Sequence, residues 1–220
     1  YRRVTNMSRV LGIRAGLGGD PSKPYGRKRP DDDACAVLPV RVDGDSAHMT
    51  DYSDYQIHLE TVLITGGTGS LGTVLVNAWL PRPDVRRIVV YSRDEVKQGA
   101  MRDTLNDPED KVRFFLGDVR DKARLRDAIA TVRTVIHAAA LKRVDQVSYN
   151  PDEVLKTNIL GTQNVLAACR EAGNKRVLVI SSDKAVHPIN VYGASKLMAE
   201  FLTVRSNVIG FPKGVRAGVL

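Results

Sequence analysis

The sequence predicts an α/β fold with a doubly wound parallel sheet, and three features of the chain lead to this prediction. From Thr61 onward, short β-branched runs alternate with helical patterns, which is typical of a parallel sheet covered by helices on both faces. A glycine-rich turn from Gly66 to Gly72 joins the first such run to the first helical pattern. Tyr192 and Lys196 stand four residues apart at the start of a later helical pattern, shortly after an apolar run.

The expected elements follow one another along the chain with turn residues between them. Strands are predicted at residues 61–65, 87–91, 112–116, 132–137, 176–180 and 215–220. Helices are predicted at residues 73–80, 94–105, 122–130, 152–172 and 192–205. Gly173 and Asn174 are typical of a helix C-cap. The chain stops inside the last predicted strand, and we interpret the domain as truncated at its C-terminal side.

Residues 1–58 differ from the rest of the chain. They are rich in Gly, Pro, Arg and Asp, and no helical or strand period persists in them. We expect an irregular or disordered extension there and a dinucleotide-binding domain over residues 59–220. The basic run at residues 27–30 is consistent with a solvated segment or with a targeting or nucleic-acid patch. Met49 is an alternative start of the natural protein.

Composition narrows the class of protein and of ligand. The formal net charge is +8, while residues 1–58 hold nine Lys/Arg and eight Asp/Glu, so the excess lies in the predicted domain. A basic field suits an anionic ligand such as a nucleotide or nucleotide-sugar, and no nucleic-acid motif is present. Cys35 and Cys169 form neither a disulfide framework nor a zinc spacing, which fits a reducing cytoplasm and no metal. No apolar run approaches the ~20 residues needed to span a bilayer.

The glycine-rich turn predicts a pyrophosphate site. Gly66, Gly69 and Gly72 have the spacing G-x-x-G-x-x-G between a strand and a helix. A dinucleotide needs a tight turn, a close approach of backbone to phosphate and free N–H groups at the helix start. An ordinary glycine-rich turn is the alternative, and the strand before it and the helix after it favour the binding site.

Tyr192 and Lys196 predict proton transfer to or from a hydroxyl group. A free tyrosine has a pKa of about 10, and a lysine ammonium beside it favours the phenolate. The alternative is an amphipathic helix with a surface lysine. Ser182, Asp183 and Lys184 follow the apolar run at residues 177–180, at the end of a strand where open α/β sheets place their chemistry. Taken alone, these three residues are also typical of an exposed polar loop.

The segment after the second predicted strand favours NADP over NAD. An acid at this position bonds the ribose of NAD, whereas an arginine accommodates the 2′-phosphate of NADP. Ser92 and Arg93 end the strand, and Lys97 lies one helical turn further on. Arg93 can hold a phosphate with its fork of donors. Asp94 could instead serve the NAD role.

Several motifs, taken jointly over residues 59–220, resemble a known family. They are the turn from Thr65 to Gly72, Tyr91-Ser-Arg-Asp-Glu95, Phe114-Phe-Leu-Gly-Asp-Val-Arg-Asp121, His137-Ala-Ala-Ala-Leu-Lys142, Lys156-Thr-Asn158, Ser182-Asp-Lys184 and Tyr192-Gly-Ala-Ser-Lys196. The turn is similar to that of extended short-chain dehydrogenases/reductases, which have a Rossmann-type fold. The motifs together resemble inverting UDP-N-acetylglucosamine 4,6-dehydratases of polysaccharide biosynthesis. Arg143 and Asp145 depart from the pattern, where His and Pro are more usual.

The resemblance implies a site, a cofactor and a reaction. Cofactor contacts are implied for Gly66, Thr68, Gly69, Ser70, Leu71, Gly72, Ser92, Arg93, Lys97, Asp118, Val119, Ala138, Ala139, Lys142 and Lys196. Substrate contacts are implied for Lys142, Thr157 and Asn158, and catalysis for Ser182, Asp183, Lys184, Tyr192 and Lys196. Asp118 could otherwise be a helix N-cap, and the alanines after the fourth strand could be core packing. A UDP-sugar substrate and, for the full-length protein, a homo-oligomer are also implied.

The implied reaction is a lyase reaction with three proton-handling groups. Tyr192 takes the proton of the sugar C4 hydroxyl, Asp183 acts as acid toward the C6 hydroxyl, and Lys184 handles the C5 proton. The Asp-Lys pair matches the inverting pattern. As a base, Lys184 must be partly neutral, so we expect burial or a nearby positive charge. A nucleotide-sugar 4-epimerase or reductase, or a non-catalytic NADP-binding regulator, is the alternative.

Overall fold

The computed structural model describes residues 61–173, 175–209 and 215–220, and they contain one six-stranded sheet with every neighbouring pair of strands parallel. The strands are β1 (Thr61–Thr65), β2 (Arg87–Ser92), β3 (Val112–Leu116), β4 (Thr134–His137), β5 (Arg176–Val179) and β6 (Arg216–Val219). The prediction for residues 1–58 and that for Asn174 lie outside the described residues.

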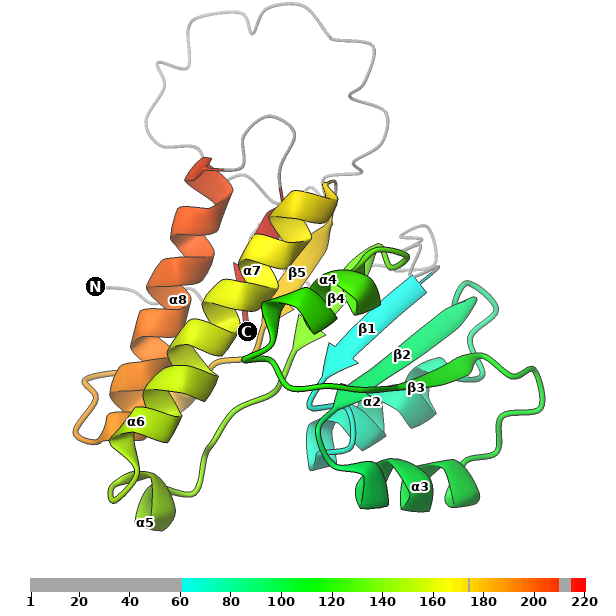
Figure 1. Cartoon of the computed structure of the whole chain (residues 1–220), viewed down its shortest axis with the longest axis horizontal. Helices are drawn as coiled ribbons and strands as arrows, with labels where there is room; N and C mark the ends of the chain where they lie inside the picture. The colour runs from blue at the N-terminus through cyan, green and yellow to red at the C-terminus, as the bar shows by residue number, and fades with distance from the viewer. Residues whose placement is uncertain (1–60, 174, 210–214) are drawn as a thin grey trace, which may run out of the picture. The chain divides into compact units, whose positions relative to one another are not determined.

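The order of the strands produces a switch point in the middle of the sheet. The order is β3-β2-β1-β4-β5-β6, so the chain moves outward from β1 in one direction and then outward from β4 in the other. Crossovers between parallel strands are right-handed, and the two directions therefore place their helices on opposite faces. In such sheets the crevice at the reversal, outside the carboxyl ends of the strands, is where ligands bind. Figure 1 shows β1 and β4 side by side at this reversal.

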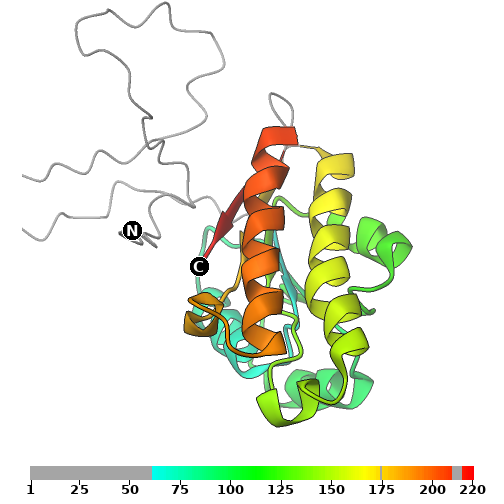
Figure 2. The same cartoon turned by 90° about the vertical axis from the view of Figure 1, so that its left-hand side faces the viewer.

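The helices form two layers. They are α2 (Ser70–Trp79), α3 (Glu95–Thr104), α4 (Lys122–Ile129), α5 (Val144–Val147), α6 (Pro151–Val154), the π-helix η3 (Leu155–Leu160), α7 (Gly161–Ala172), the 3₁₀ turn η4 (Asp183–Ala185) and α8 (Val191–Ile209). Helices α4, α7 and α8 pack side by side on one face, with α7 and α8 running alongside each other (Figure 2). Among the described helices, none combines the length and the apolar character needed to cross a membrane.

The core is built on the two central strands. All five residues of β1 are buried, and so are the last five of β2, because helices cover both faces of the sheet. Tyr91 at the end of β2 is one of the largest fully buried side chains among the described residues. Apolar residues of α4 and α7, such as Leu125 and Val165, complete the cluster on one face. The core thus holds the carboxyl ends of β1, β2 and β4 in a fixed register.

The predicted alternation of elements is confirmed, and four details of the prediction are wrong. Helix α2 starts at Ser70 rather than Thr73, so the last glycine of the turn lies inside the helix. The single helix predicted over residues 152–172 is divided into α6, η3 and α7, because the backbone widens to a π-helix at Leu155–Leu160. The short helix α5 was not predicted, and β4 begins at Thr134 rather than Val132.

The glycine turn packs backbone directly against backbone. Gly66 has φ +68°, a conformation that glycine adopts without a steric cost, and its amide bonds to the Tyr91 carbonyl at 2.8 Å. A Cβ on Gly72 would overlap the carbonyl oxygen of Gly67 and lie 2.6 Å from its carbonyl carbon. The first turn of α2 can therefore approach the end of β1 only if residue 72 has no side chain.

We expect Gly72→Ala to destabilise the domain by about 3 kcal/mol, since the added methyl group forces backbone atoms apart. Gly99→Ala in α3 is the control, because a Cβ there meets no atom within 4 Å. The control should gain roughly 0.5–1 kcal/mol of stability from its better helix propensity. Urea unfolding of both variants measures the difference, and equal stabilities would contradict the close contact.

Candidate functional site

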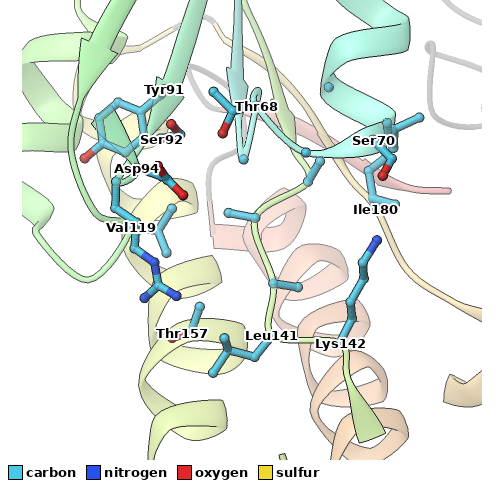
Figure 3. Close-up of a pocket in the computed structure, with 18 of the residues that line it drawn as sticks. Thr68, Ser70, Tyr91, Ser92, Asp94, Val119, Leu141, Lys142, Thr157 and Ile180 are labelled. Atoms are coloured by element: carbon cyan, nitrogen blue, oxygen red, sulfur yellow. The ribbon is translucent and has the colours of Figure 1, made fainter. Parts of the chain in front are cut away.

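A pocket of about 470 Å³ opens at the switch point, over the carboxyl ends of β1, β2 and β4. It is lined by Gly66, Thr68, Gly69, Ser70, Leu71, Gly72, Tyr91, Ser92, Arg93, Asp94, Lys97, Gly117, Asp118, Val119, Ala138, Ala139, Ala140, Leu141, Lys142, Thr157, Ile180, Ser181, Tyr192 and Lys196. Figure 3 shows residues from both halves of the sheet converging on it, with Ser92 and Asp94 at one end and Lys142 and Ile180 at the other. The pocket brings together every predicted cofactor residue.

The glycine turn forms one wall of the pocket and has the features of a phosphate site. Gly69 precedes α2, and no side chain caps the helix, so its first N–H groups are free to bind an anion. A Cβ on Gly66 would lie 2.9 Å from both the amide nitrogen and the Cα of Ala139. The alanines after β4 therefore form the facing wall of the pocket, where small side chains leave room beside the turn.

The segment after β2 presents an arginine to the pocket while its acid has a structural role. The Asp94 carboxylate accepts a hydrogen bond from the Lys97 amide at 2.9 Å and caps α3. The Lys97 ammonium lies 3.2 Å from the same carboxylate. Arg93 is 56% exposed and lines the pocket, and its guanidinium lies 3.6 Å from the Asp118 carboxylate.

The segment after β3 is held in place by a tyrosine that the sequence reasoning missed. The Tyr91 hydroxyl donates to the Asp118 carbonyl oxygen at 2.9 Å, and burial raises the pKa of this phenol. A Cβ on Gly117 would overlap that hydroxyl, so Gly117 is needed for the segment to cross over the ring. The Asp118 carboxylate accepts from the Arg120 amide, and it is Asp121 that caps α4. Asp118 is therefore not the N-cap considered as an alternative.

Tyr192 and Lys196 lie on one face of α8 and line the pocket together. Asn190 starts this helix, because its side chain accepts a hydrogen bond from the Gly193 amide at 2.8 Å. Lys196 is only 6% exposed, and its ammonium donates to the Ile180 carbonyl at 2.8 Å. Burial, and next the positive charge of Lys142, lower the pKa of Lys196 to about 8. The alternative of a surface lysine is therefore excluded.

Ser182, Asp183 and Lys184 do not belong to the pocket lining: Ser182 is the half-buried N-cap of the turn η4, and Asp183 and Lys184 lie exposed on that turn. The Ser182 hydroxyl donates to the Asp183 carboxylate at 2.9 Å, and this bond, followed by the Lys184 charge, lowers the pKa of Asp183. The expectation that Lys184 is buried or lies near a positive charge was wrong. Its side chain is 49% exposed, and an acid, Asp183, lies 3.4 Å away. The reason is that, among the described residues, no helix or strand packs over the side chains of Asp183 and Lys184.

The turn η4 is nevertheless tightly fixed to α8. A Cβ on Gly193 would overlap the Lys184 carbonyl oxygen, so the turn packs against the helix where it has no side chain. Two helical turns further along α8, the Glu200 carboxylate accepts a hydrogen bond from the Ser181 hydroxyl at 2.6 Å. Asp183 and Lys184 are therefore held in a defined position relative to Tyr192.

The predicted substrate residues are divided by the structure. Lys142 and Thr157 line the pocket, and the Thr157 hydroxyl accepts hydrogen bonds from the Arg120 guanidinium. Figure 3 shows Lys142 extending toward Ser70 and Ile180. Asn158 is 2% exposed and lies behind the lining, with its side-chain amide bonded within the protein. Its placement does not fit the predicted contact with a substrate.

Comparison with known proteins finds similarity to proteins that are named as sugar-nucleotide enzymes. A family model described as "Polysaccharide biosynthesis protein" matches residues 62–214. A UDP-N-acetylglucosamine 4,6-dehydratase (inverting) from Campylobacter jejuni is 48% identical over 160 residues, which are 73% of this chain and 47% of that protein. The chain thus spans about half of the length of the curated relatives that it matches.

Solved structures show the same architecture. The crystal structure of Pen from Bacillus thuringiensis matches with a TM-score of 0.69 and 33% identity, over 73% of this chain and 51% of that one. A UDP-glucose 4-epimerase from Brucella ovis, in complex with NAD, matches with a TM-score of 0.59 and 28% identity, over 68% and 48% of the two chains. These likenesses agree with the parallel sheet flanked by helices.

We expect Lys196 to titrate with a midpoint near pH 8, and Lys142→Met to raise that midpoint because it removes a neighbouring positive charge. NMR of the lysine Cε signals measures both values. Lys122→Met is the control, since Lys122 pairs with Glu171 and does not line the pocket. Between about pH 8 and 10.5 the unfolded chain binds more protons at Lys196, so stability should rise with pH there. An ordinary midpoint would contradict the burial.

Proposed function

The chain belongs to the polysaccharide biosynthesis protein family, and on this premise we propose that it forms the cofactor-binding part of an inverting nucleotide-sugar 4,6-dehydratase, a hydro-lyase. The observation that carries the proposal is the buried Tyr192–Lys196 pair in the same pocket as the glycine turn. The 48% identity to an inverting UDP-N-acetylglucosamine 4,6-dehydratase supports that compound as the substrate. Because this chain matches only half of that relative, activity and substrate remain part of the proposal.

The cofactor in this proposal is NADP. The glycine turn fits a dinucleotide, since a Cβ at Gly66 would fill the space between the turn and Ala139. The choice of NADP rests on the segment after β2, where Asp94 caps a helix and the exposed Arg93 lines the pocket. An arginine in this position accommodates a ribose 2′-phosphate. The Brucella epimerase is described with NAD, so the two cofactors need a direct comparison.

Arg93→Ala should weaken NADP binding by about 10- to 100-fold, the loss expected for hydrogen bonds to a charged group worth ~1.5–3 kcal/mol. Its NAD affinity should stay unchanged, because NAD lacks the 2′-phosphate. Isothermal titration of both cofactors measures this difference. Arg126→Ala is the control, with the same 56% exposure but no place in the pocket. Equal affinities of the parent chain for the two cofactors would overturn the choice of NADP.

In the first step, Tyr192 takes the proton from the C4 hydroxyl of the sugar. A dinucleotide held at the glycine turn would supply a nicotinamide ring as the acceptor and later the donor of a hydride. Lys196 assists Tyr192 as a cation, and its ammonium is held in place by the Ile180 carbonyl at 2.8 Å. A nearby positive charge favours the phenolate form of a tyrosine. The step therefore depends on the protonated form of Lys196, which is lost as the pH rises through about 8.

In the second step, Asp183 protonates the departing C6 hydroxyl and Lys184 removes the C5 proton and later restores it. The turn that carries both residues is fixed to α8 through the close contact at Gly193. The acid role of Asp183 requires its pKa to rise from the lowered value set by the Ser182 hydrogen bond. A sugar that displaces water from the exposed pair has this effect, because desolvation disfavours the carboxylate.

We expect Tyr192→Phe to abolish cofactor reduction, while Lys184→Ala still permits C4 oxidation but loses exchange of the C5 proton. A positioned acid or base contributes ~10²–10⁴-fold in rate, so both losses should be large. The assay incubates the chain with NADP and UDP-N-acetylglucosamine in deuterated water and follows deuterium at C5 by NMR.

Lys156→Ala is the control for this assay, with 54% side-chain exposure against 49% for Lys184. Deuterium entering C5 at the parent rate in Lys184→Ala would remove Lys184 from the mechanism. A parent product that is only the C4 epimer would replace the dehydratase by an epimerase, in which Asp183 and Lys184 are not needed.

A further inference from the structure

A buried chain of hydrogen bonds lies behind the pocket, with a histidine at its centre. His137, the last residue of β4, is 2% exposed and bonds through both ring nitrogens. Its Nδ1 lies 2.7 Å from the Thr65 hydroxyl on β1, and its Nε2 lies 2.9 Å from the Thr162 hydroxyl on α7. The imidazole therefore joins the two strands at the switch point to the helix that follows them.

The direction of each bond follows from the number of protons available. The Thr162 hydroxyl donates its one proton to the Asn158 carbonyl at 2.6 Å, so it can only accept from His137 Nε2–H. Burial, and next the charge of Lys196, lower the pKa of His137 to about 3, so the ring is neutral and Nδ1 is an acceptor. Thr65 accordingly donates to Nδ1, and its oxygen accepts from the Ala139 amide at 3.3 Å.

One end of this hydrogen-bond chain reaches the pocket wall that is formed by the alanines after β4. The Ala139 amide, which bonds to Thr65, also faces Gly66, where the glycine turn and the segment after β4 approach each other closely. Ala139 also lines the pocket directly. A shift of the Thr65–His137 pair would therefore move the wall opposite the glycine turn.

The other end reaches the helix that carries Tyr192. The Asn158 side chain accepts from the Leu141 amide at 2.8 Å and donates to the Leu141 carbonyl at 2.9 Å. It also donates to the Ser195 hydroxyl at 3.0 Å, and Ser195 donates in turn to the Tyr192 carbonyl at 2.7 Å. Asn158 lies in the π-helix η3, a type of distortion that often accompanies functional sites.

We propose that His137 and Thr162 are positioning residues, whose hydrogen-bond chain fixes the distance between the wall at residues 138–141 and the helix that carries Tyr192. The segment 138–141 is anchored at Ala139 through Thr65 and at Leu141 through Asn158, and His137 with Thr162 connects the two anchors. Neither residue lines the pocket. The effect on hydride removal rests on the proposed function, whereas the effect on the wall does not.

The test compares Thr162→Val, which keeps the shape and removes the hydroxyl, with Thr162→Ser, which keeps the hydroxyl. Thr203→Val is the matched control, because Thr203 is fully buried and its hydroxyl bonds to the Ala199 carbonyl within α8. Three quantities are measured: the ¹⁵N shifts of the His137 ring, hydrogen exchange of the Leu141 amide, and single-turnover cofactor reduction by UDP-N-acetylglucosamine.

We expect the parent, Thr162→Ser and Thr203→Val to keep the Nε2–H form of His137. Thr162→Val should lose this single form, exchange the Leu141 amide faster and reduce the cofactor up to ~100-fold more slowly. An Nδ1–H ring in the parent, or unchanged Leu141 exchange in Thr162→Val, would overturn the proposal. If the parent reduces no cofactor, the dehydratase assignment falls, and the ring form and the Leu141 exchange still decide the positioning role.

Discussion

The close contact of backbone with backbone at the end of β1 is the constraint on which the rest of the site depends. Gly66 faces the Ala139 backbone, and Gly72 faces Gly67, at distances that leave no space for a Cβ. These contacts hold the start of α2 against the sheet, so its free N–H groups point over the carboxyl ends of the strands. They also bring the segment after β4 across the switch point, where it becomes the second wall of the pocket.

A second constraint is the burial of charge beside this turn. Lys196 gives up most of its contact with water, and the Ile180 carbonyl is the hydrogen-bond acceptor that the structure offers its ammonium in exchange. Such an arrangement costs stability, because burial and the charge of Lys142 both disfavour the protonated form. The neutral His137 nearby adds no further positive charge. In the proposed mechanism, the buried Lys196 ammonium is the cation that assists Tyr192.

The sequence predicted the sheet well because buried strands consist of apolar, β-branched residues bounded by turn residues, as in β1 and β2. The pocket could be predicted too, since glycines and a Tyr-x-x-x-Lys spacing must meet where parallel strands end. The π-helix at Leu155–Leu160 could not, because one extra residue in a helical turn scarcely changes the apolar period. The roles of Asn158 and His137 depend on partners far along the chain, and the exposure of Lys184 depends on what covers its turn.

The pairing of Lys142 with Lys196 in one pocket links ligand binding to proton uptake. Both side chains line the same space, and the positive charge of Lys142 disfavours the protonated form of Lys196. An anionic group that settles beside them favours the protonated form of Lys196 and draws its pKa upward. Near pH 8, the binding of a diphosphate in the pocket is therefore coupled to the uptake of a fraction of a proton from the buffer. The heat of binding then contains the ionisation enthalpy of whichever buffer supplies that proton.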